Sequence, residues 1–260
     1  MTVPQTRCAW ALACALGAMF AHDGAAQTLT PWSATVSTER AHVSVGVTDQ
    51  TWTKEAAQIS WSEPADGGWV GVLERVTRNG LVDVSISTRG YSRVRDWTFL
   101  AGGGVTPAAQ FLYRGFVEGE VSRRVVGTLV ATGGYRFLLF RQARIHQFQP
   151  ALTWYHPRGE VGARMFATHN ATQDRTTPAL LVSTTYKLSP RFELSGGASF
   201  GDRIFDIAAL PTGAARSRVG FAGIRVAVTP RDSIHAGATV AQEDPSFAYR
   251  SFTLSYGRSF

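Results

Sequence analysis

Apolar and polar residues alternate one by one along most of the chain, and this two-residue period predicts β-strands with two unlike faces. The segments VDVSIST (82–88), FELSGGASF (192–200) and FTLSY (252–256) are clear cases. Helical spacing by three and four residues does not recur. After residue 26 no apolar run approaches the roughly 18 residues that a membrane-spanning helix needs. The sequence therefore predicts an all-β fold.

The segments rich in turn residues fall into two lengths. LSPR (188–191) and TPRD (229–232) are short, whereas TDQTWTKE (48–55), HNATQDRTTP (169–178) and residues 201–218 form longer segments. Toward the C-terminus the short and long segments alternate. Antiparallel strands can be joined by a tight turn at either end, so this asymmetry implies two unlike sides. Short periplasmic turns and longer extracellular loops are typical of outer-membrane barrels.

Alternating strands fit a soluble sandwich, whose apolar face lies inside, as well as a membrane barrel, whose apolar face meets lipid. The apolar faces run about 9–11 residues, the length of a tilted membrane-spanning strand. The polar faces carry small residues and scattered charges in place of a uniform coat of Lys and Glu. Aromatic residues near the predicted strand ends resemble an interfacial girdle. They are Trp52, Trp61, Trp69, Trp97, Tyr135, Trp154 and Tyr155.

These features favour the membrane barrel. We expect residues 36–260 to form a closed, antiparallel, up-and-down transmembrane β-barrel. Closure leaves no sheet edge whose hydrogen-bonding groups lipid would have to satisfy. Counting the alternating segments gives about 14 strands, with 12 as the competing count. An even number is expected because both termini should be periplasmic.

The first 26 residues have the features of a secretory signal peptide. One positive charge precedes a short apolar run at residues 8–21, and the small residues Gly24 and Ala26 suit a signal peptidase. Both cysteines of the chain lie within this segment. We expect cleavage after Ala26, a short periplasmic lead-in at residues 27–35, and the outer membrane of a Gram-negative bacterium as the destination.

The basic residues are nearly all arginine. Lys54 and Lys187 are the only lysines among 26 basic residues, and the formal net charge is +7. Planar guanidinium groups suit bidentate contact with phosphates and carboxylates, although a GC-rich genome would give the same bias. We expect outer-membrane lipid and lipopolysaccharide as partners and no nucleic acid. The smooth apolar belt gives no reason to require an oligomer.

The last ten residues, SFTLSYGRSF, predict the closing strand of the barrel. Phe252, Leu254 and Tyr256 share one face, and Phe260 ends the sequence. A terminal Phe on such a strand resembles the signal that the barrel-assembly machinery recognises. Arg258 departs from that signal, because an apolar residue is more usual at its position. The alternative is an ordinary edge strand that ends in Phe by chance.

Four segments together resemble one family: RGYSRVRDWTFLAGGG (89–104), QFLYRGFVEGEVSRR (110–124), GGYRF (133–137) and FELSGGASFGDR (192–203). Most of residues 33–260 is similar to the YaiO family of outer-membrane β-barrel proteins. The shared motifs are glycine and aromatic patterns and not a catalytic signature. The resemblance implies a barrel in a Gram-negative outer membrane with no established enzymatic role. Some members look linked to sugar-modifying or tetratricopeptide modules, which implies a connection with cell-surface polysaccharide, but this chain carries no such module.

The polar faces of the predicted strands identify candidate lumen residues. They are Arg114, Glu118, Glu120, Arg164, Glu193, Arg225 and His235. These charges either line a polar channel or neutralise each other in a packed lumen. Residues 135–147 are expected to form an extracellular loop, whose Arg136, Arg141 and Arg144 are candidates for contact with lipopolysaccharide phosphates.

One pair of residues raises the question of catalysis. Outer-membrane lipid hydrolases use a His-x-Ser pair on one strand face, and His42 and Ser44 have that spacing, with Glu39 nearby. Ala41 and Val43 occupy the apolar face, so we expect His42 and Ser44 to point into the lumen, away from any lipid ester. The remaining histidines lack metal-ligand spacing, and the glycine-rich segments precede no helix that could bind phosphate. We therefore expect no enzyme, no metal and no cofactor.

Three functions remain open. The first is a pore or conduit for small polar or saccharide solutes across the outer membrane. The second is a non-conducting structural or assembly barrel associated with cell-surface polysaccharide. The third is an outer-membrane lipid hydrolase, which the expected orientation of His42 and Ser44 disfavours.

Overall fold

The computed structural model describes residues 31–63, 66–202, 216–243 and 247–260, and these residues form β-strands joined by turns. The strands are β1 (Trp32–Val45), β2 (Thr48–Glu63), β3 (Gly67–Arg78), β4 (Leu81–Val94), β5 (Trp97–Val105), β6 (Gly115–Val126), β7 (Leu129–Leu139), β8 (Arg144–Phe148), β9 (Ala151–His156), β10 (Gly159–Asn170), β11 (Arg175–Ser189), β12 (Phe192–Asp202), β13 (Arg216–Ala227), β14 (Asp232–Glu243) and β15 (Phe247–Ser259). Within the described ranges no helix is long and apolar enough to cross a membrane.

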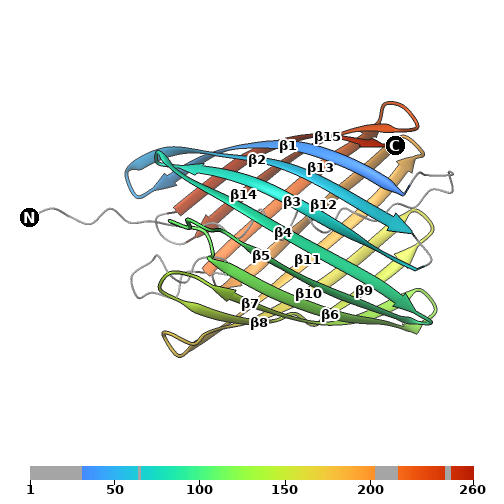
Figure 1. The fold of residues 1–260 in the computed structure, drawn as a ribbon, viewed down its shortest axis with the longest axis horizontal. Coiled ribbons are helices and arrows are strands. Elements are labelled where there is room, and N and C mark those ends of the chain that lie inside the picture. The colour runs from blue at the N-terminus through green and yellow to red at the C-terminus, as the bar shows by residue number, and fades with distance from the viewer. Residues whose placement is uncertain (1–30, 64–65, 203–215, 244–246) are drawn as a thin grey trace, which may run out of the picture.

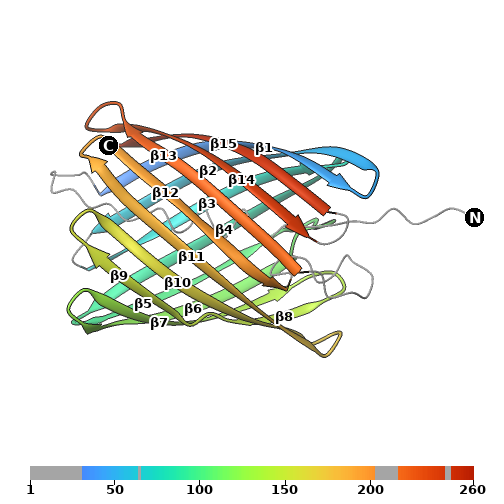
Figure 2. The same ribbon diagram turned by 180° about the vertical axis from the view of Figure 1, so that it is seen from behind.

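The strands close into one antiparallel barrel, in which they run obliquely around the axis (Figures 1 and 2). Apart from β8 and β9, strands that follow each other in the chain are neighbours in the sheet, and β1 pairs with β15 from Ser33↔Ser259 to Val45↔Phe247. The backbone N–H of Phe260 donates to the carbonyl oxygen of Trp32 at 3.1 Å, so the last residue lies beside the start of β1. We call this the terminal end of the barrel and the opposite end the distal end.

The barrel has 14 strands around its wall, because β8 and β9 are two halves of one. Both halves lie between β7 and β10. They are separated by Gln149 and Pro150, and proline cannot donate to a strand ladder. Gln149 still exchanges backbone hydrogen bonds with Gly134 at 2.8 and 3.2 Å, so the wall is continuous there. The count of 14 is confirmed, and the competing count of 12 is wrong.

The two ends of the barrel differ in their connections, although less regularly than expected. At the terminal end β6 joins β7 through Gly127 and Thr128, whereas at the distal end residues 106–114 join β5 to β6. Several distal connections are nevertheless short, since two residues join β1 to β2 and β3 to β4, and four join β7 to β8 and β10 to β11. Residues 48–55, expected as a long loop, begin β2 instead, because Gly46, at φ 59°, completes the turn after β1. Residues 203–215 lie outside the described part.

The first described strand begins four residues earlier than the start expected at residue 36. Strand β1 begins at Trp32, within the segment 27–35 that we expect as a periplasmic lead-in. The signal peptide expected at residues 1–26 lies outside the described residues. The last of the predicted strands is β15, which closes the sheet against β1.

The outer face of the barrel carries a belt of exposed apolar side chains. Members of this belt include Val36, Ile59, Leu73, Ile86, Val117, Leu180, Leu194, Phe252 and Leu254. An aromatic girdle follows the terminal end of the same face, where the rings of Trp32 and Trp69 meet edge to face at 5.6 Å. A belt with an aromatic rim is the outer surface expected of a barrel in a bilayer.

The alternation is reversed at one corner of the distal end, formed by residues 40–52 of β1 and β2 and residues 247–251 of β15. We call it the inverted corner. Here Val43, Trp52 and Tyr249 point inward and are buried in one apolar cluster. His42 and Arg250, which lie opposite each other in the sheet, point outward and are exposed.

The inverted corner corrects two expectations. His42 and Ser44 do not face the lumen, since Ala41 and Val43 occupy the inner face of β1. Trp52 does not belong to the outer girdle, because it is buried inside the barrel. The apolar residues of β1 change from even to odd positions along an unbroken strand. The expected orientation of His42 and Ser44 assumed that Ala41 and Val43 face lipid, and it is therefore wrong.

Candidate functional site

The inner face of the barrel contains six of the seven predicted lumen residues. The register of the strands places Glu118, Glu120, Arg164, Glu193, Arg225 and His235 on that face. Arg114 lies just before β6, in the connection from β5, and its side chain is exposed. The six residues are not gathered at one point: two groups form on β4–β10, and a third follows β11–β14.

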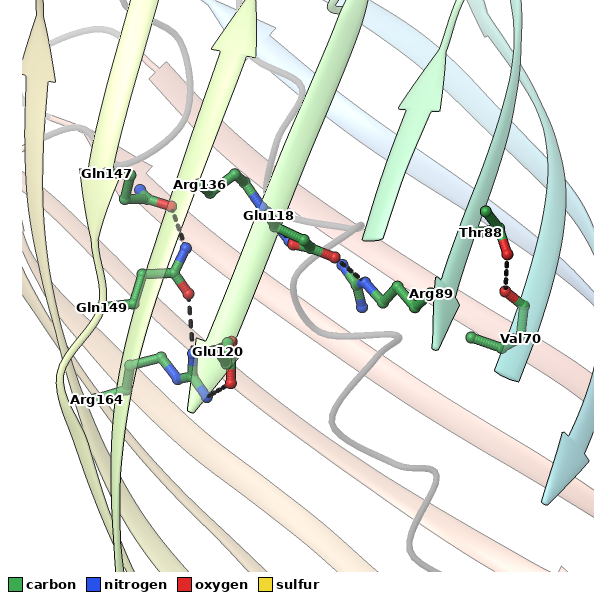
Figure 3. Close-up of polar contacts among 9 residues, drawn as sticks. All are labelled: Val70, Thr88, Arg89, Glu118, Glu120, Arg136, Gln147, Gln149 and Arg164. Carbon is green, nitrogen blue, oxygen red and sulfur yellow. Dashed lines mark hydrogen bonds and ion pairs between the residues drawn. The ribbon is translucent and has the colours of Figure 1, made fainter. Parts of the chain in front are cut away.

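Glu118 is the centre of the first group (Figure 3). Its carboxylate accepts from Arg89 of β4 on one oxygen and from Nε of Arg136 of β7, at 2.7 Å, on the other. The Glu118 side chain is only 5% exposed. Gly102 of β5 leaves the space for this contact, because a Cβ there would lie 2.7 Å from Cγ of Arg89 and 3.0 Å from Oε1 of Glu118. Arg89 therefore reaches across a glycine to a carboxylate two strands away.

Arg136 was expected in an extracellular loop, and this expectation is wrong. Strand β7 continues to Leu139 and turns tightly, with the N–H of Phe140 donating to the carbonyl of Ala143 at 2.8 Å. Residues 137–139 continue the strand with apolar side chains on both faces, and Leu138 is buried inside. Arg141 lies in this turn and Arg144 begins β8, and both are exposed at the distal end.

Glu120 and Arg164 form the second group, also in Figure 3. Nη1 and Nη2 of Arg164 donate to the two carboxylate oxygens of Glu120 at 2.7 and 3.2 Å. Nη1 also donates to Oε1 of Gln149 at 2.9 Å, and Nε2 of Gln149 donates to Oε1 of Gln147 at 2.7 Å. The pair spans from β6 to β10 above Gly134 of β7, where a Cβ would be 3.1 Å from Cγ of Glu120.

Together the two groups form a charged wall on one side of the lumen. Three guanidinium groups of Arg89, Arg136 and Arg164 face two carboxylates of Glu118 and Glu120, which leaves one excess positive charge. Guanidinium and amide N–H groups next to carboxylate oxygens can donate to and accept from hydroxyl groups. Such a wall is suited to polar, uncharged or anionic solutes.

The third group lies near the terminal end of β11–β14. Lys187, Glu193, Arg225 and His235 are consecutive partners across these four strands. Glycine again leaves room for a side chain, since a Cβ on Gly223 would be 2.7 Å from Nε2 of His235. A positive, a negative and a second positive side chain, with His235 next to the last of them, therefore line a second part of the lumen wall.

The connection between β5 and β6 folds against the inner face at the distal end. Asp83 of β4, whose side chain points inward and which is 1% exposed, accepts backbone N–H groups of Gln110, Phe111 and Leu112 at 2.8, 2.9 and 2.7 Å. The guanidinium carbon of Arg78 lies 5.2 Å from the ring centre of Phe111. Asp83 therefore holds residues 110–112 inside the mouth of the barrel.

Sequence reasoning missed Arg89 and Asp83. In the sequence Arg89 shares the polar face of its strand with Ser85 and Ser87, a signal that could have placed it in the lumen. Nothing in the sequence links Asp83 to residues 110–112, because the contact depends on how the connection folds. Within the described ranges no group of three or more His, Cys, Asp or Glu side chains could hold a metal ion.

The residues of the expected assembly signal lie on the outer face of β15. Phe252, Leu254 and Tyr256 are exposed on the apolar belt, and Phe260 is exposed at the terminal end. Arg258 shares the outer face and lies 3.7 Å from Asp232 of β14. The apolar row is thus accessible from the lipid side, and whether the assembly machinery uses it stays a prediction.

Solved outer-membrane barrels share this fold. The translocator domain of the autotransporter NalP from Neisseria meningitidis is similar with a TM-score of 0.54 and 12% identity, over 95% of this chain and 93% of that chain. The NanC porin gives a TM-score of 0.54 and 10% identity, over 86% and 100%. Omp33 of Acinetobacter baumannii gives 0.52 and 13%, over 88% and 98%. At such identities the likeness establishes the fold alone.

No protein-family model matches the sequence, and no curated protein matches it. The similarity to the YaiO family therefore stays a resemblance. What the structure establishes is a closed 14-strand transmembrane β-barrel with a charged inner wall.

Proposed function

We propose that the protein is a pore in the outer membrane of a Gram-negative bacterium that conducts small polar or saccharide solutes. The observation that carries this proposal is the charged wall of Arg89, Glu118, Arg136, Glu120 and Arg164 on the inner face. Porins, including NanC, are among the barrels that share the fold. A wall with both donors and acceptors can replace water around a hydroxyl-rich solute as it passes.

Single-channel recording in planar lipid bilayers tests the pore. The refolded mature chain should give steady, ohmic conductance steps. In a salt gradient, Glu118→Gln should shift the reversal potential toward anion selectivity, because it removes a lumen carboxylate and leaves two guanidinium groups. Silence of the wild-type chain at several voltages would overturn the pore.

A second candidate is a non-conducting structural or assembly barrel. The contact of Asp83 with residues 110–112 favours it, since that contact holds part of a connection inside the distal mouth. In this case the wild-type chain should be silent, and deletion of residues 107–112 should open a conductance. A wild-type chain that already conducts at the level of the deletion variant would exclude a closed mouth.

The remaining partners are proposals of the same kind. Arg141 and Arg144, which are exposed at the distal end, are proposed to bind lipopolysaccharide phosphates there. The row Phe252, Leu254 and Tyr256 with Phe260 is proposed as the segment that the barrel-assembly machinery binds. A link to surface polysaccharide would follow from the resemblance to the YaiO family and from nothing else on the chain.

A further inference from the structure

Three polar side chains meet on the outer face of the inverted corner. Ser44 of β1 donates its hydroxyl to Oδ1 of Asp49 of β2 at 2.6 Å, and Nε2 of His42 lies 3.6 Å from the same oxygen. The side chains of His42 and Asp49 are 58% and 67% exposed. A serine, a histidine and an aspartate therefore share one outward-facing site, with the carboxylate between the other two.

The site lies at the distal edge of the apolar belt. Arg250 is opposite His42, and the next outward pair toward the terminal end is Arg40 with Phe252. Phe252 is 56% exposed and belongs to the belt. The boundary between hydrocarbon and headgroups in a bilayer is the level at which the acyl esters of lipids lie. His42 lies one outward row and Ser44 two outward rows beyond Phe252, so both are on the headgroup side of the belt with their side chains on its outer face.

Basic residues flank the site on the same face. Arg40 precedes His42 by two positions on β1, and Arg250 is its direct neighbour on β15. Guanidinium groups bind phosphate through bidentate hydrogen bonds. A lipid that carries both an acyl ester and a phosphate, in its headgroup or on its sugar, would complement this arrangement.

We propose that His42, Ser44 and Asp49 form a hydrolytic site for carboxylic esters of phosphorylated acyl lipids. The expectation that disfavoured hydrolysis, a lumen-facing His42 and Ser44, does not hold in the structure. Ser44 is the nucleophile, His42 is the general base, Asp49 orients the imidazole, and Arg40 and Arg250 bind the phosphate. These roles match the Ser, His and carboxylate chemistry that recurs on unrelated folds.

The reaction proceeds through an acyl-enzyme. The Ser44 hydroxyl turns from Asp49 to Nδ1 of His42, whose Nε2 keeps its contact with Asp49, and Nδ1 accepts the Ser44 proton as Oγ bonds to the ester carbonyl carbon. The bond from that carbon to the lipid oxygen then breaks, and the lipid oxygen takes the proton from the imidazolium. Water, deprotonated by His42, attacks the acyl-Ser44 ester, releases a free fatty acid and returns the proton to Ser44.

A lipid assay tests the activity and distinguishes two sources of the ester. The refolded mature chain is incubated with phosphatidylglycerol vesicles in one arm and with purified lipopolysaccharide in the other, and released fatty acids are measured by mass spectrometry. We expect release in at least one arm. Ser44→Ala and His42→Ala should each lower it about 100-fold or more, and Asp49→Asn less. Ser37→Ala, an inward serine of the same strand, is the matched control and should retain full release.

A covalent probe tests the nucleophile without assuming the lipid. An alkyl fluorophosphonate should add to Ser44 with loss of fluoride, and the adduct should be absent in Ser44→Ala and strongly reduced in His42→Ala. Absence of fatty-acid release in both arms together with an unlabelled Ser44 would overturn the site. Release that is unchanged in Ser44→Ala would overturn it as well. Ser44→Ala should keep the wild-type conductance in either case, so failure of the hydrolytic site and failure of the pore are separate results.

Discussion

Strands β1 and β15 run through both the middle of the barrel and the inverted corner, but their apolar side chains point outward in the middle and inward at the corner. In the middle of β1 and β15, Val36 and Leu254 point outward, while the inner face carries serine and threonine. At the corner Val43 and Tyr249 are buried inside, and His42 is exposed outside. The register from Ser33 to Val45 is continuous, without a bulge. Alternation therefore tells which residues share a face, and the surrounding medium decides which face is apolar.

The physical reason is the length of the strands. Strand β1 has 14 residues and β2 has 16, whereas a tilted strand needs about 9–11 to cross the bilayer. Where the strands extend beyond the hydrocarbon, the outer face meets water and headgroups. The inner face can then be covered like the core of a soluble β-sandwich.

The largest expected effect concerns the buried inner face of the inverted corner. Val43→Arg would place an unpaired charge at a position with no solvent exposure, which we expect to lower the free energy of unfolding by about 3–5 kcal/mol. His42→Arg, one residue away and outward, should change it by less than about 0.5 kcal/mol. Urea unfolding in lipid vesicles, followed by tryptophan fluorescence, measures both. Equal effects would contradict the inversion.

The next largest effect concerns the inner face in the middle of the barrel. Glu118→Ala removes the carboxylate that Arg89 and Arg136 share, and we expect a loss of roughly 2–3 kcal/mol because two guanidinium groups lose a charged hydrogen-bond partner. The same unfolding measurement applies. Glu55→Ala, at an exposed outer ion pair with Arg75, is the control and should cost at most about 1 kcal/mol.

A smaller effect concerns how closely side chains pack on the inner and outer faces of the barrel wall, away from the corner. Gly102→Ala would bring a Cβ to 2.9 Å from the backbone oxygen of Thr88, and such overpacking costs about 1–3 kcal/mol. Gly133→Ala on the outer face meets nothing within 4 Å and should be nearly neutral. A similar loss in both variants would mean that the inner face is no more crowded than the outer one.

The smallest effect concerns the connection at the distal mouth, which Arg78 links to the corner by lying over the rings of both Trp52 and Phe111. Asp83→Asn keeps one acceptor oxygen and weakens the contact with residues 110–112, which we expect to cost roughly 1 kcal/mol. Limited proteolysis should then cleave within residues 106–114 faster than in the wild type. A cleavage rate equal to that of the wild type would show that Asp83 is not what holds the connection.

The number of strands and the residues that face the lumen in the middle of the barrel could be predicted from the sequence, because the same two-residue alternation runs through nearly all strands. Glu118, Glu120 and Arg164 lie on the inner face that their alternation indicates. The sequence could not pair Arg164 with Glu120, since that contact crosses Gly134 between strands 44 residues apart. Pairing depends on register and on the space that glycine leaves, and neither is visible in a single strand.

The orientation of the corner was the main failure, although a signal for it was present. The apolar positions of β1 are even-numbered through Val36 and odd-numbered from Ala41. A change of phase in one strand means either a bulge or a change of surroundings, and the sequence alone does not distinguish them. For the same reason the sequence analysis assigned Trp52, a member of the inner apolar cluster, to the outer aromatic girdle.

The seam between β1 and β15 has a consequence for biogenesis. The two strands that seal the wall, β1 and β15, are the first and the last of the described strands, and 13 residue pairs join them. All the strands between them must be synthesised before β1 and β15 can begin to pair. Until then both flanking strands keep open backbone groups, which lipid cannot satisfy, and an incomplete chain would need a chaperone or a catalyst of insertion to stay out of aggregates.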